Sequence, residues 1–423
     1  MSFWVHAAAA KHPDRVALEG PERSLTYAEL SRAAIGAAGA LERVVDPGGR
    51  VALALPAGEE FVIALHGCLL AGMAAVPVDL RLSADERAVR EAAAGVVIDS
   101  LPSAQRPQMP SVFGGDPVVA VMHTSGTTAA PKPVELTYGN FLASALGSAV
   151  ALGLDSAERW LCPMPLTHVG GLSIPIRSAI YATTVVLHGR FDTEAVLREL
   201  MDPARRITLV SLVPTMLARL LDAGLERPPT LRWALLGGGP IAPALLERAE
   251  RAGVPVAPTY GMTEACSQIA TFGWPLPGVE LRLEAGEILV RGPIVSRGSL
   301  AEDGWLHTGD LGRFDDRERL GIVGRKADTI VSGGENVAPA EVEAALVAHP
   351  AVVDAAVLGR PDPEWGEALV ARVVLRNGGE VAPEALRAHV AARLARFKVP
   401  KSVEFVDTLP RTASGKLLRR ELR

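Results

Sequence analysis

The chain has 423 residues, of which 48% are hydrophobic and 22% are charged, a composition typical of globular proteins that excludes global disorder. Its 43 Lys and Arg against 48 Asp and Glu give a net charge of −5, which favours neither nucleic acid nor an anionic membrane as a partner. Cys68, Cys162 and Cys266 are too few and too scattered for a disulfide framework or a zinc site. We expect them to be small apolar core residues.

Three uncharged runs, at residues 61–78, 136–154 and 160–176, are long enough to raise the question of a membrane span. Gly, Pro, His or Asn interrupts each run, so none has the continuous apolar character of a spanning helix. The N-terminus shows no long apolar stretch with a cleavage site, so no signal peptide is visible. We therefore expect a cytoplasmic protein that does not bind membranes.

The first two-thirds of the chain alternates helix and strand signals. Thr26 and Glu29 form a capping-box pair before an Ala-rich helix, Ser83 and Glu86 form another, and a helix is predicted from about Glu59. Short apolar runs predict strands at 51–55, 74–78, 96–98, 118–122, 183–187, 207–212, 233–236 and 254–258. Continuous apolar strands between helices indicate buried, largely parallel sheets with helices on both faces.

The pattern changes near residue 279. The segments 279–283 and 287–290 predict a hairpin, and a second strand pair surrounds Asp315. From about Ala327 the pattern predicts helices begun by Pro339 and Pro383 and strands at 352–358, 368–375 and 403–406. We therefore predict an α/β fold with two domains. Residues 1–325 form a large domain of mixed, largely parallel sheets flanked by helices, and residues 326–423 form a small, mobile α+β domain.

The strongest chemical motif is Thr124-Ser-Gly-Thr-Thr128, which follows an apolar strand and precedes Lys132. Hydroxyls and free backbone N–H groups in such a loop can cradle a polyphosphate, and the lysine adds a positive charge. The Walker pattern is absent. Taken alone, the motif fits a polar turn between strands equally well.

Three further segments fit a nucleotide site. In Thr259-Tyr-Gly-Met-Thr-Glu264, Gly261 permits close backbone approach, Tyr260 offers a face for a planar ring, and Glu264 can hold Mg²⁺ through phosphate oxygens. The glycines 237–239 end an apolar strand, where α/β sheets place ligands. Asp310 lies in a Gly-bounded loop and can accept hydrogen bonds from two ribose hydroxyls. Each segment alone also fits an ordinary turn or helix cap.

Together with Gly324-Arg325, Ser332-Gly-Gly-Glu335 and Arg411-Thr-Ala-Ser-Gly-Lys416, these segments make the chain resemble the adenylate-forming acyl-CoA synthetases over its whole length. Its compact length and the segments 236–240 and 259–268 are most similar to the o-succinylbenzoate–CoA ligases of menaquinone biosynthesis. The resemblance implies ATP, Mg²⁺ and coenzyme A, with a small carboxylic acid as substrate. The acid would first form an acyl-adenylate, from which CoA displaces AMP. A homodimer stays open.

The resemblance also implies roles for individual residues. The ATP and AMP site would comprise Thr124, Ser125, Gly126, Thr127, Thr128, Lys132, Gly238, Gly239, Tyr260, Gly261, Asp310 and Arg325, with Mg²⁺ at Glu264. Catalysis would fall to Lys416, which bridges carboxylate and phosphate, to His168 at the gate of the acyl pocket, and to Thr263 near the α-phosphate. The acid pocket would comprise His168, Ser173, Arg177, Gly261, Ser267 and Gln268, and Gly333 and Gly334 would admit CoA.

Three positions depart from the family pattern. Ala129 and Pro133 stand where the phosphate loop usually has glycine, and an alanine at positive φ costs about 1 kcal/mol, so this loop would be stiffer or shifted. Ala327 replaces the usual Asp of the hinge, which puts the timing of domain rotation in question. Three alternative functions stay open: another aryl- or medium-chain acyl-CoA ligase, an enzyme that loads a carrier protein, and an inactive nucleotide-binding homologue.

Overall fold

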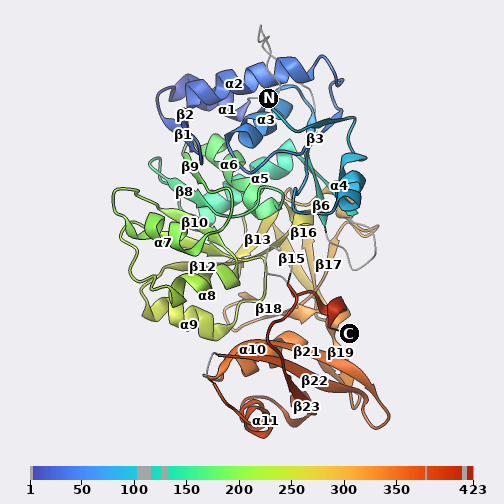
Figure 1. The fold of residues 1–423 in the computed structure, drawn as a ribbon. Helices are drawn as coiled ribbons and strands as arrows, with labels where there is room; N and C mark the ends of the chain where they lie inside the picture. The colour runs from blue at the N-terminus through green and yellow to red at the C-terminus, as the bar shows by residue number, and fades with distance from the viewer. Residues whose placement is uncertain (1–2, 102–115, 125–131, 377–378, 412–416, 423) are drawn as a thin grey trace.

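In the computed structural model, residues 3–101, 116–124, 132–376, 379–411 and 417–422 are described. These residues form four β-sheets with helices packed against them, and the C-terminal part of the chain gathers at one end of the molecule (Figure 1). No helix within the described ranges is long and apolar enough to cross a membrane.

The long sheet has the strand order β14-β13-β12-β11-β10-β8-β9-β1-β2. Its strands are β1 Val16–Glu19, β2 Ser24–Thr26, β8 Arg159–Cys162, β9 Thr184–Leu187, β10 Leu209–Leu212, β11 Trp233–Leu236, β12 Val256–Met262, β13 Ser267–Thr271 and β14 Trp274–Pro275. The strands from β12 to β1 pair in parallel. The two ends of the sheet pair antiparallel, at β1–β2 and at β12–β13–β14.

A second sheet has the order β5-β3-β4-β6-β7. Its strands are β3 Arg50–Leu53, β4 Ala74–Pro77, β5 Val96–Ile98, β6 Val118–Thr124 and β7 Lys132–Thr137. Strand β7 lies at the edge and runs antiparallel to β6, with Thr124 opposite Lys132. The predicted phosphate loop therefore connects two antiparallel strands. Proline lacks an N–H donor and is tolerated at a sheet edge, so Pro133 on β7 fits its position.

Helices fill the space around these two sheets. They are α1 Trp4–Lys11, α2 Tyr27–Leu41, α3 Glu59–Leu70, α4 Ala84–Glu91, α5 Tyr138–Leu152, α6 Val169–Tyr181, α7 Thr193–Met201, α8 Pro214–Asp222 and α9 Pro243–Arg251. The two predicted capping boxes begin α2 and α4, and Thr137 with Asn140 forms a third at α5. Buried residues of α2, α3, β3 and β8 belong to one continuous core, which joins the two sheets.

The last two sheets follow in the chain. Strands β15 Glu280–Glu284, β16 Glu287–Arg291, β17 Leu306–Phe314 and β18 Leu320–Arg325 form an antiparallel sheet. The C-terminal sheet comprises β19 Ile330–Ser332, β20 Glu335–Val337, β21 Val352–Asp362, β22 Gly366–Leu375 and β23 Ser402–Phe405. Helices α10 Pro339–Val347 and α11 Pro383–Ala391 share a separate apolar core with this sheet, which includes Val342 and Leu386.

The α/β class predicted from the sequence is confirmed, as is the predominance of parallel strands at the centre of the long sheet. Strands β1, β2, β7, β8, β13, β14, β19 and β20 were not predicted from the sequence. Of these, β8 and β1 pair in parallel within the long sheet, whereas β7, β13 and β14 pair antiparallel with their neighbours. The predicted β12 also ended at residue 258, whereas the strand continues to Met262 because β13 folds back along it.

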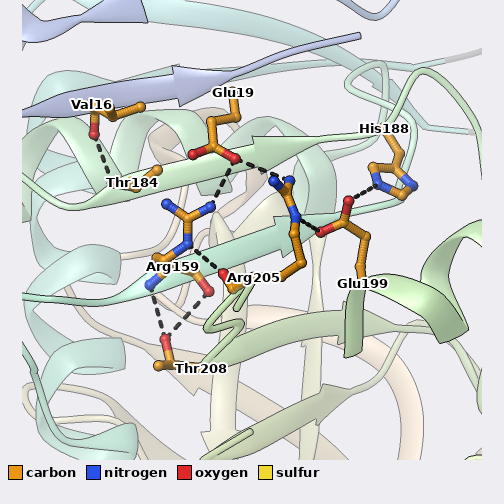
Figure 2. Close-up of polar contacts among 8 residues, drawn as sticks. All are labelled: Val16, Glu19, Arg159, Thr184, His188, Glu199, Arg205 and Thr208. Carbon is orange, nitrogen blue, oxygen red and sulfur yellow. Dashed lines mark hydrogen bonds and ion pairs between the residues drawn. The ribbon is translucent and has the colours of Figure 1, made fainter. Parts of the chain in front are cut away.

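A network of ion pairs ties β1 to the middle of the long sheet (Figure 2). The Glu19 carboxylate accepts hydrogen bonds from Arg159 at 2.7 Å and from Arg205 at 3.0 Å. Arg205 also donates to Glu199 at 2.7 Å, and His188 lies 3.8 Å from the other oxygen of Glu199. Burial would raise the pKa of Glu199, but the nearby His188 and the hydrogen bond from Arg205 lower it below its usual value. One carboxylate, Glu19, therefore binds both Arg159 of β8 and Arg205 of the turn that follows α7.

We expect Glu19→Gln to lower the free energy of unfolding by about 1–2 kcal/mol, because it leaves both partly buried arginines without their shared carboxylate. Glu194→Gln is the matched control, since its pair with Arg198 on the surface of α7 is largely exposed. Urea denaturation of the two variants checks this. Equal stability of both variants would contradict a structural role for the network.

Candidate active site

Asp310 joins three strands at the centre of the predicted nucleotide site. The Tyr260 hydroxyl, on β12, donates to Asp310 Oδ2 at 2.8 Å, and Arg325 Nε, at the end of β18, lies 2.7 Å from Oδ1. The carboxylate is buried, with 9% of its side chain exposed. Burial and the charge of Asp310 raise the pKa of Tyr260, so the phenol stays a donor at neutral pH. Each carboxylate oxygen can accept more than one hydrogen bond, so this arrangement is compatible with ribose hydroxyls.

The glycine triplet lies beside Tyr260 because β11 and β12 are parallel neighbours. A Cβ atom on Gly237 would lie 2.7 Å from the Cγ2 atom of Thr259, so only glycine fits there. Gly238 has a φ of +76°, which glycine adopts without strain. Gly239 has more space, since the nearest atom to a Cβ there would be 3.7 Å away. The predicted adenine residues Gly238, Gly239 and Tyr260 are therefore brought to the same edge of the sheet.

Gly261 is required by the fold itself. A Cβ atom at this position would lie 1.6 Å from the carbonyl oxygen of Ser267 on the returning strand β13. The turn between the strands holds Cys266 at a φ of +49° and Ser267 at +91°, both in the left-handed region that side chains rarely adopt. Such strain persists only where the surroundings enforce it, and it is common at functional sites. The close backbone approach predicted for Gly261 is therefore made by the chain's own β13.

Thr263 and Glu264 begin a 3₁₀ turn, Thr263–Ala265, that contacts β7. The backbone carbonyl of Glu264 accepts a hydrogen bond from Ser296 at 2.8 Å. Mg²⁺ prefers oxygen ligands and usually takes only one or two carboxylates beside water and phosphate. In the described ranges no group of three or more His, Cys, Asp or Glu side chains forms a metal site. A single carboxylate fits a Mg²⁺ ion that is held mainly by nucleotide phosphates.

The phosphate-loop prediction is only partly visible. Thr124 ends β6, and its hydroxyl lies 3.4 Å from the carbonyl oxygen of Lys132, whose side chain is exposed. Because β7 contacts the 3₁₀ turn, Lys132 and Glu264 belong to neighbouring elements. Four predicted site residues, Ser125, Gly126, Thr127 and Thr128, lie outside the described residues together with Ala129.

His168 immediately precedes α6, and its loop folds tightly against the first turn of that helix. A Cβ atom on Gly171 would lie 2.3 Å from the carbonyl oxygen of Pro165, so glycine is needed for this approach. Burial lowers the pKa of His168, Asp79 opposes this shift, and Arg81 adds to it. The imidazole is therefore neutral at neutral pH. A neutral, half-buried imidazole is better suited to the predicted gate than to binding a carboxylate as a cation.

Arg177, two turns further along α6, is a buried cation without a carboxylate partner in the part of the chain that the structure describes. Its Nη2 donates to Ser144 Oγ at 2.9 Å, and its Nε has no hydrogen-bond partner there. The Ser144 hydroxyl in turn donates to the carbonyl of Cys266 at 2.7 Å. Burying an unpaired charge is costly, so this guanidinium is suited to an anionic group of a ligand.

Other predicted acid-pocket residues lie around Arg177. Ser267 follows Cys266, and the side chain of Gln268 donates to Thr271 Oγ1 at 2.9 Å while its Oε1 is buried without a described partner. Ser173 is less available, because its hydroxyl donates to the backbone carbonyl of Val169 at 2.6 Å within α6. Ser144 was not predicted from the sequence. It lies with Asn140 and Ser148 among the buried residues of α5, and this spacing of four between polar residues is the signal that could have indicated it.

The predicted CoA residues form the turn between β19 and β20. Gly333 has a φ of +60° and Gly334 of +82°, as a tight two-residue hairpin of the type I′ class requires. The Gly333 N–H donates to the carbonyl of Trp365 at 2.8 Å, and a Cβ on Gly333 would lie 3.0 Å from the Trp365 ring. Lys416 lies outside the described residues. The structure therefore places the glycine turn but not the predicted catalytic lysine.

Comparison with known proteins gives one consistent family. Residues 5–112 and 91–300 match the family model described as AMP-binding enzyme, and residues 341–416 match the AMP-binding enzyme C-terminal domain. The chain is 39% identical to the 2-succinylbenzoate–CoA ligase of Bacillus licheniformis over 475 aligned positions, which cover 99% of this chain and 98% of that relative.

Two solved structures are similarly close. The o-succinylbenzoate coenzyme A synthetase (MenE) of Bacillus subtilis in complex with the acyl-adenylate intermediate OSB-AMP has a TM-score of 0.92 and 36% sequence identity, and the match covers 100% of this chain and 98% of that chain. The same synthetase in complex with ATP and a magnesium ion has a TM-score of 0.91 and 36% identity, over 100% and 99% of the two chains.

We expect Tyr260→Phe to weaken binding of ATP, the nucleotide predicted from the sequence, by roughly 10- to 100-fold. The substitution removes the charge-assisted hydrogen bond that orients Asp310, which is worth roughly 1.5–3 kcal/mol. Isothermal titration calorimetry measures this. Tyr27→Phe is the control, because that buried phenol bonds only the carbonyls of Ser178 and Thr183 and should leave the ATP affinity unchanged. Unchanged affinity in Tyr260→Phe would remove Asp310 from the nucleotide site.

Proposed function

Because the chain belongs to the AMP-binding enzyme family, we propose that it is an ATP-dependent acid–CoA ligase that converts o-succinylbenzoate to its CoA thioester in menaquinone biosynthesis. The similarity over nearly the full length of this chain and of its relatives supports this activity. The observation that carries the choice of acid is the buried, unpaired Arg177. O-succinylbenzoate has two carboxylates, and only one of them reacts.

The reaction proceeds in two half-reactions. A carboxylate oxygen of the acid attacks the α-phosphorus of ATP, the bond to the β-phosphate oxygen breaks, and pyrophosphate leaves behind an acyl-adenylate. The CoA sulfur, as thiolate, then attacks the acyl carbonyl, and AMP leaves with the electron pair of the broken C–O bond. Neither half-reaction forms a covalent bond to the enzyme. Rate enhancement therefore comes from positioning the reactants and stabilising charge.

In the proposed active site, Asp310 holds the ribose hydroxyls while Tyr260 and Arg325 fix its carboxylate. Gly238 and Gly239 leave room for adenine beside the Tyr260 ring. When bound at Glu264, Mg²⁺ would neutralise charge on the phosphates. Further positions follow the sequence prediction: the phosphates contact Thr124–Thr128 and Lys132, Thr263 lies near the α-phosphate, His168 gates the acyl pocket, Lys416 bridges carboxylate and phosphate, and Gly333 and Gly334 admit CoA.

We place the boundary between the two domains at residues 325–326. The two family models lie on either side of it, and Lys326 forms an ion pair at 2.8 Å with Glu287 on β16, across the boundary. Rotation of the C-terminal domain between the half-reactions stays a prediction, as does the homodimer. We place the enzyme in the cytoplasm, where ATP and CoA are supplied.

Arg177 explains how one acid is selected. A second carboxylate that reaches Nε would supply the missing hydrogen-bond partner and the missing negative charge together. Ser144 would assist, since its hydroxyl accepts from Arg177 and donates to the carbonyl of Cys266, the residue before Ser267. A monocarboxylate would leave the buried guanidinium unpaired, at a cost typical of buried charges. The pocket therefore selects a dicarboxylate.

We expect kcat/KM for o-succinylbenzoate to exceed that for benzoate, for medium-chain fatty acids and for the analogue that keeps only the reactive carboxylate by about 100-fold, the range of a buried charge pair. The measurement is ATP-dependent pyrophosphate release together with detection of the CoA thioester, with and without Mg²⁺. Comparable rates with monocarboxylates would keep the ligase chemistry but contradict the choice of acid. No activity with any acid would contradict the ligase assignment.

The same assay applied to Arg177→Met isolates the selective contact. The preference for o-succinylbenzoate over the reactive analogue with one carboxylate should fall to within a few-fold, because the methionine cannot form an ion pair with the second carboxylate. Arg177→Lys should retain part of the preference through its charge. Arg232→Met, which breaks the Arg232–Glu158 ion pair elsewhere in the large domain, is the control and should keep the full preference.

A further inference from the structure

Asp310 lies in an irregular part of strand β17. The register between β16 and β17 shifts there, so that residues 308–310 of β17 lie opposite the single residue Ile288 of β16. Gly309, in the middle of this bulge, has a φ of +68°, which glycine adopts without strain. Bulges re-aim side chains and are common beside active sites. The conformation of the bulge therefore decides where Asp310 presents its carboxylate.

The carboxylate of Glu287, at the start of β16, holds this bulge. Its Oε1 accepts a hydrogen bond from the backbone N–H of Gly309 at 3.0 Å. The carboxylate is buried, with 10% of the side chain exposed. Beside it, the Thr308 hydroxyl donates to the carbonyl of Ile288 at 2.7 Å. Glu287 thus supplies a charged acceptor to the residue directly before Asp310, and such charge-assisted hydrogen bonds are the stronger ones.

The second oxygen of Glu287 binds a residue on the other side of the domain boundary. Oε2 accepts a hydrogen bond at 2.8 Å from Nζ of Lys326, the first residue after the boundary at 325–326. The hydrogen bond from Lys326 lowers the pKa of Glu287, burial opposes this shift, and the N–H of Gly309 adds to it. The carboxylate is therefore ionised at neutral pH. One side chain connects the predicted ribose site to the start of the C-terminal domain.

Arg325 and Lys326 are adjacent in sequence, and both act on the bulge. Arg325 contacts it directly, with Nε 2.7 Å from Asp310 Oδ1 and Nη1 donating to the carbonyl of Thr308 at 3.2 Å. Lys326 acts on it through Glu287. Arg325 already belongs to the predicted nucleotide site, whereas Glu287 and Lys326 were not predicted to have a role in it. The second route from the boundary to the bulge is thus made entirely by these two residues.

We propose that Glu287 is a positioning residue for nucleotide binding, which holds the β17 bulge so that Asp310 meets the ribose hydroxyls, and that Lys326 fixes Glu287 in turn. This inference rests on the function proposed above. The two charges act in series, because Lys326 affects the bulge only through the carboxylate of Glu287. A movement of the C-terminal domain that withdraws Lys326 would loosen the hold on the ribose. By linkage, a bound nucleotide would stabilise the Glu287–Lys326 ion pair.

The test measures the affinity of the full-length enzyme for ATP by isothermal titration calorimetry. Glu287→Ala removes the acceptor of the Gly309 N–H and should weaken ATP binding about 20-fold. Glu287→Gln keeps an acceptor oxygen for that N–H but loses the ion pair, so it should weaken binding only about threefold. Lys326→Met, at a position whose side chain is 62% exposed, should have the same small effect. The double variant of Glu287→Gln and Lys326→Met should bind ATP no more weakly than either single variant, because both remove one ion pair.

Steady-state kinetics separate positioning of the nucleotide from a general loss of structure. The KM for ATP should rise in the same order as the dissociation constants. The KM for o-succinylbenzoate should stay within about twofold of the wild type, because the predicted acid pocket around Arg177 is built by other elements. A general structural defect would raise both KM values together.

Glu280→Gln is the matched control. It neutralises an exposed carboxylate that pairs with Arg291 in the same sheet, and it should leave the ATP affinity unchanged. Unchanged affinity in Glu287→Ala or in Lys326→Met would overturn the inference, as would additive losses in the double variant or an equal rise of both KM values.

If Glu287→Ala fails to fold, Glu287→Gln, Lys326→Met and their double variant still complete the cycle. Failure of the wild-type enzyme to bind ATP would instead contradict the proposed function, so the two failures are distinguishable.

Discussion

The carboxylate of Asp310 is the point on which the organisation of the site depends. Through Tyr260 it binds the long sheet, and through Arg325 it binds the last strand before the C-terminal domain. Because the group is buried, a hydrogen bond on each oxygen is needed to keep it charged and oriented. In the proposed function, the same three residues that connect the sheets would also provide a preformed acceptor for the ribose diol.

The predicted acid pocket also contains a buried charge, the guanidinium of Arg177, but its surroundings differ from those of Asp310. The protein supplies hydrogen-bond partners to Asp310, whereas Arg177 has a serine hydroxyl and the face of the Trp160 ring, but no carboxylate, as partners among the described residues. Protein interiors seldom retain such a cation unless something compensates it. The hydroxyl of Ser144 offsets part of this cost. In the proposed function, a second carboxylate of the substrate would offset the rest, and this incomplete pairing would favour a dicarboxylate.

Much of the fold follows from local sequence signals. The capping boxes at Thr26 and Ser83, the helices begun by Pro339 and Pro383, and the strand at residues 233–236 depend on neighbours within a few positions, and the structure has them where they are predicted. The antiparallel ends of the sheets were missed. Strand β13 exists because Cys266 and Ser267 adopt left-handed backbone and Gly261 has no side chain, a combination that no local pattern signals.

In the candidate site, too, single residues could be predicted from the sequence, whereas the contacts between them could not. Motifs along the sequence indicated Tyr260, Asp310 and Arg325 individually, but the hydrogen bonds that join them span 50 and 15 positions. The Ser144–Arg177 contact spans 33 positions and combines residues that look ordinary in sequence. Glycine was interpreted as room for a ligand at Gly261, where the structure shows room for a strand. Long-range pairing and backbone contacts of this kind are set by the tertiary fold alone.

The most direct test of the central claim is a single-turnover experiment without CoA. Enzyme in excess is mixed with Mg²⁺, o-succinylbenzoate and ATP labelled at the α-phosphate, and the quenched mixture is analysed by mass spectrometry and radiometry. The account predicts that the label moves from ATP into one enzyme-bound o-succinylbenzoyl-adenylate per active site, with one pyrophosphate released, and that later addition of CoA converts it to thioester and AMP. Label that remains in ATP, or that appears only as free AMP without an adenylate, would contradict it.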